Sequence, residues 1–276
     1  MKKVYNILIL SNLNDEDARE DQMILESFKK DGNNVEIKWI DYNEKLDNSF
    51  DVILKRNIWV QNKNDFIKYE KYNEILNKRL ENKPIKKVNF DGIDRNGKKY
   101  LINYYKEGLP VIPSSDNLED VIKGYDEFIL KPLNSLKSAI GQIDVNRTDL
   151  DKCFKEGMLI QPKIKFKSEV QCYFVADELM YSLEFIPSKF PNYPKPILIN
   201  LTENERKEVY RFIERINLKV GFLRLDFLRL ENNCLVLLEI EATSPFMALN
   251  YIEEELRNKV IDRYKKNVYK FLLEKP

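Results

Sequence analysis

The feature that most constrains this chain is a pair of apolar segments, residues 222–230 and 234–240, joined by a short polar stretch. Asn232 and Asn233 lie between them, and asparagine tolerates the positive φ that a tight hairpin turn requires. We therefore expect a two-residue turn at Asn232 and Asn233. The segments on either side would form adjacent antiparallel strands, with side chains that alternate between two faces.

This register gathers four charged side chains on one face of the hairpin. Asp226 is expected opposite Glu239, and Arg224 is expected opposite Glu241. The other face would be apolar and would consist of Leu223, Leu225, Phe227, Val236, Leu238 and Ile240.

The charged face can be interpreted as a solvated polar surface or as a metal site, and the opposed pair Asp226 and Glu239 distinguishes the two. A solvated polar face is the ordinary one, and Arg224 across from Glu241 suits it, because opposite charges across a ladder stabilise slightly. Asp226 across from Glu239 does not suit it, because like charges that are directly opposed are destabilising. A divalent cation held by both carboxylates removes this conflict. Oxygen ligands favour Mg²⁺ or Mn²⁺, and Mg²⁺ usually shares its coordination with substrate phosphates.

Composition excludes several kinds of chemistry. The 276 residues include no histidine, which excludes Ser-His-Asp and Cys-His nucleophiles, His-ligated zinc and imidazole acid–base catalysis. Chemistry must then rest on carboxylates, lysines, arginines, backbone amides or a bound metal. The net charge of +1 provides no overall field toward nucleic acid or membrane, and we expect neither as a partner.

The cysteines and the N-terminal residues indicate the cellular compartment in which the protein is expected. Cys153, Cys172 and Cys234 are far apart and odd in number, which favours a reducing environment. The apolar run at residues 7–10 is too short for a signal peptide or a membrane span. We expect a cytoplasmic protein.

Alternating strand and helix patterns predict a small α/β domain with a mostly parallel sheet at the N-terminus. The strand patterns cover residues 4–10, 35–40 and 50–54 with 58–59, and the helical patterns cover 15–30 and 65–80. The periodicity breaks around 83–97, where proline and glycines cluster, so we place the domains at 1–92 and 93–276.

The second part is expected to be α+β, because strands follow one another without regular crossover helices. Strand patterns cover residues 128–132, 158–161, 169–176, 179–186, 222–230 and 234–240, and helical patterns cover 100–108, 202–217 and 252–273.

A phosphate ligand would need positive charge, and the chain has neither a Walker A motif nor a kinase glycine loop. Lys131 ends an apolar strand, where an ammonium needs a partner, and the polar loop 134–141 follows it. The alternative for Lys131 is a lysine that extends from a strand end into water. Lys98 is a second candidate, although lysines in exposed loops are common.

Six motifs occur in the order and at about the intervals of one known superfamily. They are Asn96-Gly-Lys-Lys-Tyr-Leu, Gly108-Leu-Pro-Val-Ile-Pro-Ser, Phe128-Ile-Leu-Lys-Pro, Leu159-Ile-Gln-Pro-Lys-Ile, Arg224-Leu-Asp and Leu238-Glu-Ile-Glu-Ala-Thr-Ser-Pro. This set resembles the ATP-grasp superfamily, and in particular its glutathione-synthetase-like branch of carboxylate–amine (or thiol) ligases. The resemblance implies an ATP-grasp domain with a lid at about residues 120–160.

The resemblance also implies roles for individual residues. Lys98 and Lys131 would contact ATP phosphates, and Arg224 would stabilise the transferring phosphoryl group together with Lys131. The adenine hinge would consist of Gln161, Pro162, Lys163 and Ile164, with Glu169 at the ribose. The Mg²⁺ or Mn²⁺ ligands would be Asp226, Glu239 and Glu241, the last at a position more often occupied by asparagine.

Residues 50–59 are similar to the R-x-x-W-D-Y segment of a subgroup that includes the cyclo-ligase of D-cycloserine formation. Val60 and Gln61 follow Trp59, so the acid of that segment is missing. Arg56 could bind a substrate carboxylate with its planar fork, or it could be a surface arginine at a strand end.

Two further departures from the family concern the lid and one strand. The lid loop is poorer in glycine than is usual. Glu184 stands where relatives often have a basic residue, and Lys189 is a candidate to compensate.

The resemblance implies an ATP-dependent ligase with ATP and Mg²⁺ (or Mn²⁺). The γ-phosphoryl group would pass to the carboxylate of a small amino acid or peptide, and an amine would then attack the acylphosphate. Two alternatives remain open: a kinase that releases the phosphorylated product, and a non-catalytic nucleotide-binding regulatory protein. The sequence leaves the oligomeric state open, a homodimer included.

Overall fold

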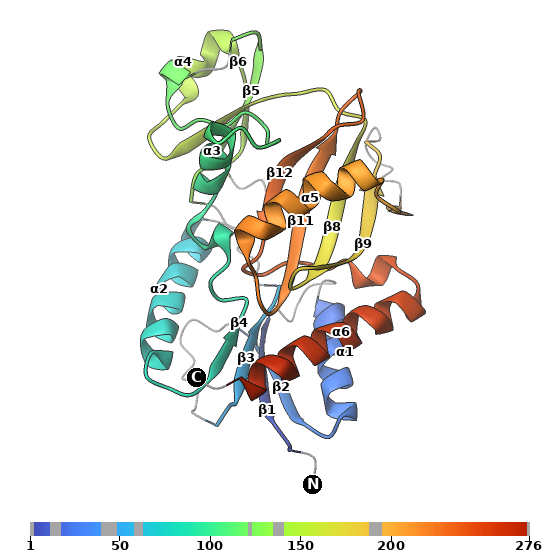
Figure 1. Ribbon diagram of the computed structural model, residues 1–276. Helices are drawn as coiled ribbons and strands as arrows, with labels where there is room; N and C mark the ends of the chain where they lie inside the picture. Colours follow the sequence, from blue (N-terminus) through green and yellow to red (C-terminus); the bar gives the residue numbers. More distant parts are fainter. Residues whose placement is uncertain are drawn as a thin grey trace.

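The computed structural model describes residues 3–11, 18–39, 49–57, 63–120, 123–134, 141–187 and 195–274. These residues form three β-sheets that follow one another along the long axis of the molecule, with helices on their faces (Figure 1). Within the described ranges, no helix combines the length and hydrophobicity needed to cross a bilayer.

The first sheet is entirely parallel, with strand order β2-β1-β3-β4, which confirms the predicted N-terminal α/β domain. Its elements are β1 (Asn6–Ser11), α1 (Ala18–Lys30), β2 (Asn34–Trp39), β3 (Val52–Lys55), α2 (Lys63–Leu80) and β4 (Lys86–Val88). The sequence did not predict β4, because three residues at a sheet edge are too few to show a period of two.

The second sheet is antiparallel, with strand order β10-β9-β8-β11-β12. Its strands are β8 (Ser168–Val175), β9 (Glu178–Phe185), β10 (Ile197–Ile199), β11 (Phe222–Arg229) and β12 (Leu235–Glu241). Helix α5 (Glu203–Ile216) crosses one face (Figure 1) and begins with a capping box between Thr202 and Glu205. With α3 (Lys99–Lys106) it packs one apolar core against that face.

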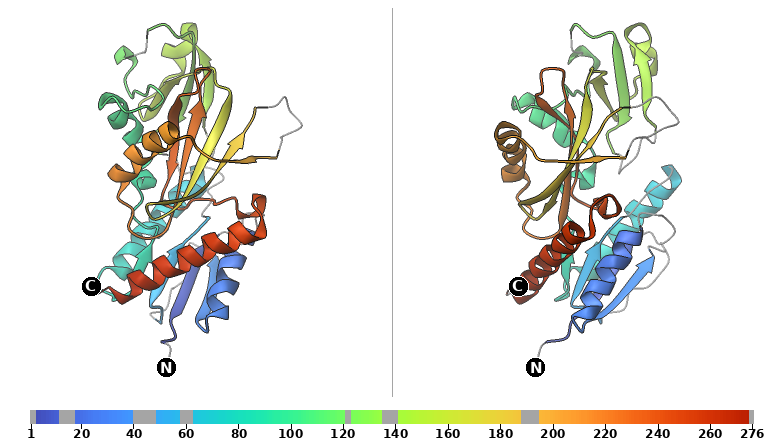
Figure 2. Two further views of the ribbon diagram at one scale, coloured as in Figure 1. Left: turned by 45° about the vertical axis from the view of Figure 1, so that its right-hand side comes forward. Right: turned by 90° about the vertical axis from the view of Figure 1, so that its right-hand side faces the viewer.

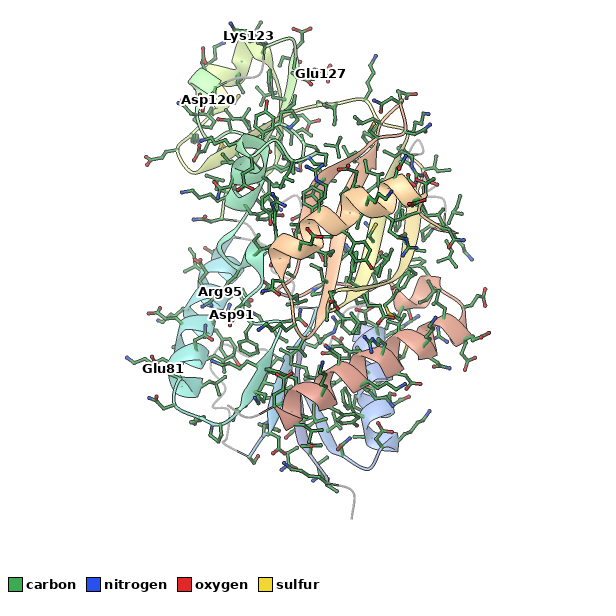
Figure 3. All side chains as sticks on the ribbon, in the orientation of Figure 1. Glu81, Asp91, Arg95, Asp120, Lys123 and Glu127 are labelled. Carbon is green, nitrogen blue, oxygen red and sulfur yellow. The ribbon has the colours of Figure 1, made fainter. Side chains whose placement is uncertain are left out.

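The third sheet is small and antiparallel, with strand order β6-β5-β7. It lies largely within residues 120–160, where the lid was predicted, and its action as a lid stays a prediction. Its elements are β5 (Glu127–Pro132), β6 (Ile143–Asn146), α4 (Leu150–Cys153) and β7 (Met158–Pro162). It lies at the end of the molecule opposite the first sheet (Figure 2). Asp120, Lys123 and Glu127 mark its exposed outer surface (Figure 3).

Short 3₁₀ helices and one long helix complete the chain. The 3₁₀ helices are η1 (Ile93–Asn96), η2 (Leu118–Asp120), η3 (Arg147–Asp149) and η4 (Leu249–Tyr251), and α6 (Glu254–Leu273) is the last helix. Helix α6 lies beside α1 and shares one apolar core with the first sheet and with the ends of β8 and β9 (Figures 1 and 2). The chain thus returns to the first sheet, and the division at residues 92/93 stays a prediction.

The β11–β12 hairpin has a longer turn than the sequence predicted. The Leu230 N–H donates to the Cys234 carbonyl at 2.9 Å, and the Asn233 N–H donates to the Leu230 carbonyl at 2.9 Å. The loop therefore has three residues, 231–233, and Asn233 occupies the left-handed region at φ 66°. A three-residue loop that ends in a left-handed residue is a common hairpin connection, so the two-residue turn was wrong.

A β-bulge at Leu238 corrects the register before the charged residues. Phe227 pairs with Leu237, whereas Asp226 pairs with Glu239 and Arg224 pairs with Glu241. The extra residue of the turn and the extra residue of the bulge cancel, so both charged pairs lie where they were predicted. Between turn and bulge the faces are exchanged, which corrects the predicted apolar face. The core residues there are Leu235 and Leu237, and not Val236 and Leu238.

Truncation of the two adjacent leucines tests this bulge. Leu237 is 0 % exposed, so Leu237→Ala should lower the free energy of unfolding by about 2–5 kcal/mol through lost burial and a cavity. Leu238 is only partly buried, so Leu238→Ala should cost less than about 1.5 kcal/mol. Urea unfolding of both variants measures the difference, and a larger loss for Leu238→Ala would mean that the bulge is not at this position.

Candidate active site

The charged face of the β11–β12 hairpin lies opposite the α5 face, and its charges are buried. Asp226 is 5 % exposed and Glu241 is 7 % exposed, so they do not form a solvated surface. Arg224 Nε and Nη2 donate to both oxygens of Asp226, at 2.7 and 2.8 Å, and Nη2 also donates to Glu241 Oε1 at 2.8 Å. One guanidinium therefore bonds to two neighbouring carboxylates, to Asp226 through its planar fork.

Lys98 provides the counter-ion of the remaining acid in the hairpin. Its ammonium forms an ion pair with the Glu239 carboxylate, and the lysine is 5 % exposed. The Lys98 N–H donates to the carbonyl of Leu133, directly after strand β5, at 2.7 Å. Gly97 has φ 88°, and a Cβ there would lie 1.9 Å from the Leu133 oxygen. Only glycine allows this approach, so Gly97 holds Lys98 between the lid and β12.

Lys131 lies on β5, in the third sheet. Burial lowers its pKa, the nearby Lys98 lowers it further, and Glu239 and Glu169 oppose the shift. Lys131 and Lys98 come from different segments, and the charge of Lys98 acts on Lys131. The structure pairs Lys98 with Glu239, and the place of Lys131 in the same site stays a prediction.

Burial and neighbouring charges shift the two opposed acids in opposite directions. Burial raises the pKa of Asp226 to about 7, even though Arg224 lowers it. Burial also acts to raise the pKa of Glu239, but Lys98, followed by Lys131 and Arg224, holds this pKa below its usual value. The two carboxylates therefore differ in their tendency to bind a proton, because burial dominates at Asp226 and the neighbouring cations dominate at Glu239.

The donor set fits a hard divalent cation in its chemistry. Asp226, Glu239 and Glu241 offer only carboxylate oxygens, and the first two lie directly opposite each other on adjacent strands. In this structure their oxygens are bonded to Arg224 and Lys98 instead. Accordingly, within the described part of the chain no three acidic, Cys or His side chains are gathered around one point.

Strand β8 adds a polar row beside the hairpin, in which Glu169 was predicted to lie at the ribose, whereas Gln171 and Tyr173 were not predicted to belong to the site. Gln171 pairs with Asp226 across the ladder, and Tyr173 pairs with Arg224. Gln171 Nε2 donates to Glu169 Oε1 at 2.7 Å, and the Tyr173 hydroxyl donates to Gln171 Oε1. The alternation of residues 169–173 was the available signal, because these polar side chains share the face of Asp226.

The predicted adenine hinge lies at the end of β7. Gln161 is 1 % exposed, and its Nε2 donates to Ser114 Oγ at 3.0 Å. The Lys163 N–H donates to the Glu127 carbonyl at 2.9 Å, and the Lys163 ammonium pairs with Asp144 at 2.9 Å on the exposed side of the lid. A hydrogen bond to Asp144 raises the pKa of Lys163. The base-binding roles of these residues, and of Pro162 and Ile164, stay a prediction.

Arg56 differs from both interpretations offered for it, since it is 0 % exposed and so is not a surface arginine. Its guanidinium pairs with Glu20 and with Asp21 (Nε to Oδ1, 3.0 Å), and Nη1 donates to the Pro245 carbonyl at 2.8 Å. All three nitrogens are thus bonded within the protein, and Arg56 is not accessible to a substrate carboxylate. Glu20 and Asp21 were missed, because acids in a first helical turn suit the helix dipole.

Glu184 lies on the far side of the second sheet. It pairs with Arg229 and accepts a hydrogen bond from Ser168, and Arg229 also pairs with Glu205 at 2.7 Å. A cavity of about 1040 Å³ opens on this side beside Arg229 and Arg211, and none of the clustered acids lines it. Glu184 is therefore not part of the charged cluster. Lys189, Trp59 and most of the loop 134–141 lie outside the described residues.

Comparisons with solved structures identify the fold. No protein-family model matches the sequence, and a search of curated proteins finds no match. Solved structures of ATP-grasp ligases, in contrast, match over nearly the whole chain, at identities too low to establish more than the fold. This chain has the ATP-grasp fold.

Three of these structures define the similarity. D-cycloserine synthetase DcsG is 16 % identical with a TM-score of 0.72, covering 97 % of this chain and 99 % of that one. The ATP-grasp ligase PsnB with its minimal precursor, Mg and ADP is 14 % identical with a TM-score of 0.66, covering 97 % and 99 %. D-alanine–D-alanine ligase from Bacillus anthracis, complexed with ATP, is 15 % identical with a TM-score of 0.64, covering 98 % and 99 %.

The raised pKa of Asp226 predicts a particular dependence of stability on pH. With a pKa of about 7 when folded and about 3.9 when unfolded, the folded protein binds the extra proton between these values. The stability that Asp226 contributes is present at low pH and is lost as the pH rises toward 7, by up to about 1.4 kcal/mol per pH unit. Urea unfolding from pH 4.5 to 8 should show wild type losing stability relative to Asp226→Asn.

Glu239→Gln provides the control of opposite sign. Because the pKa of Glu239 is lowered in the folded state, its contribution is present above the unfolded value of about 4.3 and is lost as the pH falls below it. Wild type should therefore lose stability relative to Glu239→Gln only in acid. A flat difference between wild type and Asp226→Asn from pH 5 to 7 would contradict the assignment.

Proposed function

We propose that this protein is an ATP-dependent carboxylate–amine ligase that acts through an acylphosphate. The observation that carries the proposal is the buried cluster of Arg224, Asp226, Glu239 and Glu241, which faces Lys98 and Lys131 within an ATP-grasp fold. Buried opposed acids and converging lysines suit a ligand that carries both divalent metal and phosphate.

In the first step, a carboxylate oxygen of the substrate attacks the γ-phosphorus of ATP. The bond from that phosphorus to the β–γ bridging oxygen breaks, and ADP leaves. In the second step, the lone pair of an amine attacks the carbonyl carbon of the acylphosphate, inorganic phosphate leaves, and the amine nitrogen loses a proton. The products are an amide, ADP and phosphate.

The residues of the cluster would act by position and charge. Lys98 and Lys131 would hold the phosphates, and Arg224 would offset the charge that develops on the transferring group. Asp226 and Glu239, with Glu241 beside them, would hold Mg²⁺. When bound, Mg²⁺ supplies charge neutralisation and orientation of the phosphate oxygens. No step requires histidine, which agrees with its absence from the sequence.

The similar structures suggest which substrates to test. The names of D-cycloserine synthetase and D-alanine–D-alanine ligase indicate small amino-acid chemistry, whereas PsnB was solved with a peptide precursor. We therefore infer a substrate that is either a small amino acid or a peptide with a free carboxylate. Arg56 is not proposed as its direct ligand, because that side chain is fully buried and paired.

Binding of Mg-ATP gives the first test. A saturating ligand should raise the melting temperature, by roughly 5 °C at a hundredfold excess over Kd. The double variant Asp226→Asn/Glu239→Gln should abolish the increase, because it removes the carboxylate pair that would hold the metal. Differential scanning fluorimetry with and without Mg-ATP measures both effects.

A matched control for that variant changes one aspartate and one glutamate elsewhere. Asp116→Asn/Glu203→Gln alters the same number of charges at two exposed positions and should keep the full increase. An undiminished increase in Asp226→Asn/Glu239→Gln would remove the metal assignment.

Turnover gives the second test. A phosphate-release screen of amino acids and short peptides as paired acid and amine substrates should find a pair that releases phosphate together with ADP. Release of ADP without phosphate, with a stable phosphorylated product, would assign a kinase instead. Binding of Mg-ATP without turnover of any pair would favour a regulatory nucleotide-binding protein.

A further inference from the structure

We propose that Lys98 and Arg224 are internal counter-ions of the metal-binding carboxylates, and that metal and nucleotide can bind only together. The inference rests on the proposed function, since it concerns the same site. It adds that a free divalent cation cannot bind at the site until a triphosphate draws the Lys98 and Arg224 side chains away from the carboxylates.

Glu239 shows the arrangement most clearly. Its carboxylate is paired with the Lys98 ammonium; the lysine side chain is 7 % exposed and the glutamate side chain is 24 % exposed, so the pair is partly withdrawn from water. The tyrosine behind the pair, Tyr100, accepts a hydrogen bond from the Ile240 N–H at 2.8 Å, which fixes the backbone next to Glu239. Glu239 therefore has a built-in partner at the position where a metal would be.

Arg224 holds the other two acids in the same way. It makes two parallel bonds to Asp226 and a third to Glu241, with 11 % of its side chain exposed. Nη1 also donates to the Phe246 carbonyl at 3.3 Å, so the guanidinium is bonded on several sides. Two protein cations thus bond to each of the three proposed metal ligands: Arg224 to both oxygens of Asp226 and to Oε1 of Glu241, and Lys98 to Oε1 of Glu239.

Charge balance explains why either ligand alone would bind poorly. A divalent cation alone would displace Lys98 from Glu239 and leave that ammonium unpaired beside Lys131, which already repels it. Triphosphate alone would draw Lys98 away and leave the Glu239 carboxylate facing phosphate. When both ligands enter, the lysine pairs with phosphate and the carboxylate pairs with metal, so no buried charge loses its partner.

Removal of one counter-ion should therefore create a metal site that needs no nucleotide. Titration of Mn²⁺ into the nucleotide-free full chain, with free Mn²⁺ followed by electron paramagnetic resonance, should show no tight binding to wild type. Lys98→Met should gain one Mn²⁺ site with an affinity at least about tenfold higher, equivalent to about 1.4 kcal/mol.

Two controls separate this effect from net charge. Lys99→Met removes the same charge from the adjacent exposed position and should bind Mn²⁺ as wild type does. Lys98→Met/Glu239→Gln should lose the gained site, because the freed carboxylate is its ligand. If Lys98→Met does not fold by circular dichroism, Lys98→Gln takes its place, since it also lacks the charge.

The outcomes are distinguishable from failure of the proposed function. Tight Mn²⁺ binding by nucleotide-free wild type, or no gain in a folded Lys98 variant, would overturn the counter-ion proposal even if Mg-ATP stabilises wild type. Absence of any Mg-ATP stabilisation of wild type would overturn the proposed function itself. The proposal would be supported if Lys98→Met gains a Mn²⁺ site that neither Lys99→Met nor the double variant Lys98→Met/Glu239→Gln has.

Discussion

The interaction on which the site depends is the juxtaposition of Asp226 and Glu239 on adjacent strands of a buried sheet face. Two carboxylates in this position repel each other and lose hydration, so the fold must supply positive charge. It does so from two separate directions. Arg224 approaches from the same strand as Asp226, and Lys98 approaches from the segment that touches the lid. The hairpin and the start of α3 are therefore joined by an ion pair, and a backbone hydrogen bond from Lys98 joins the same segment to the end of β5.

The charged pairs were predicted correctly although the turn between the two strands was not, because two unpredicted features of the hairpin cancel. The turn has one residue more than was expected, and β12 carries a bulge at Leu238 that offsets it. Either feature alone would have placed Asp226 against a different residue. The changed register is visible in the core, because Leu235 and Leu237 are buried there in place of the predicted Val236 and Leu238. Alternating patterns identify strands well, but they give register only as far as turn and bulge are known.

The longer elements and the order of the sheets were predictable, whereas short strands and distant ion pairs were not. Strands β4, β6 and β10 have three or four residues, too few for a periodic signal. Arg56, Glu20 and Pro245 meet from three distant parts of the sequence, and each has an ordinary local explanation in the sequence. Fully buried ion pairs of this kind depend on tertiary packing, which local patterns do not encode.

The same buried ion pairs make the first sheet part of the candidate site. The segment that follows Glu241 is fixed at successive points: Thr243 by Asp94, the Pro245 carbonyl by Arg56, and the Met247 N–H by Glu20. Its Phe246 carbonyl also accepts a bond from Arg224. A displacement of the first sheet would therefore move the backbone that contacts Arg224, and with it the guanidinium that is bonded to Asp226 and Glu241. The position of the charged cluster thus depends on both sheets, although its side chains come from the hairpin and from Lys98.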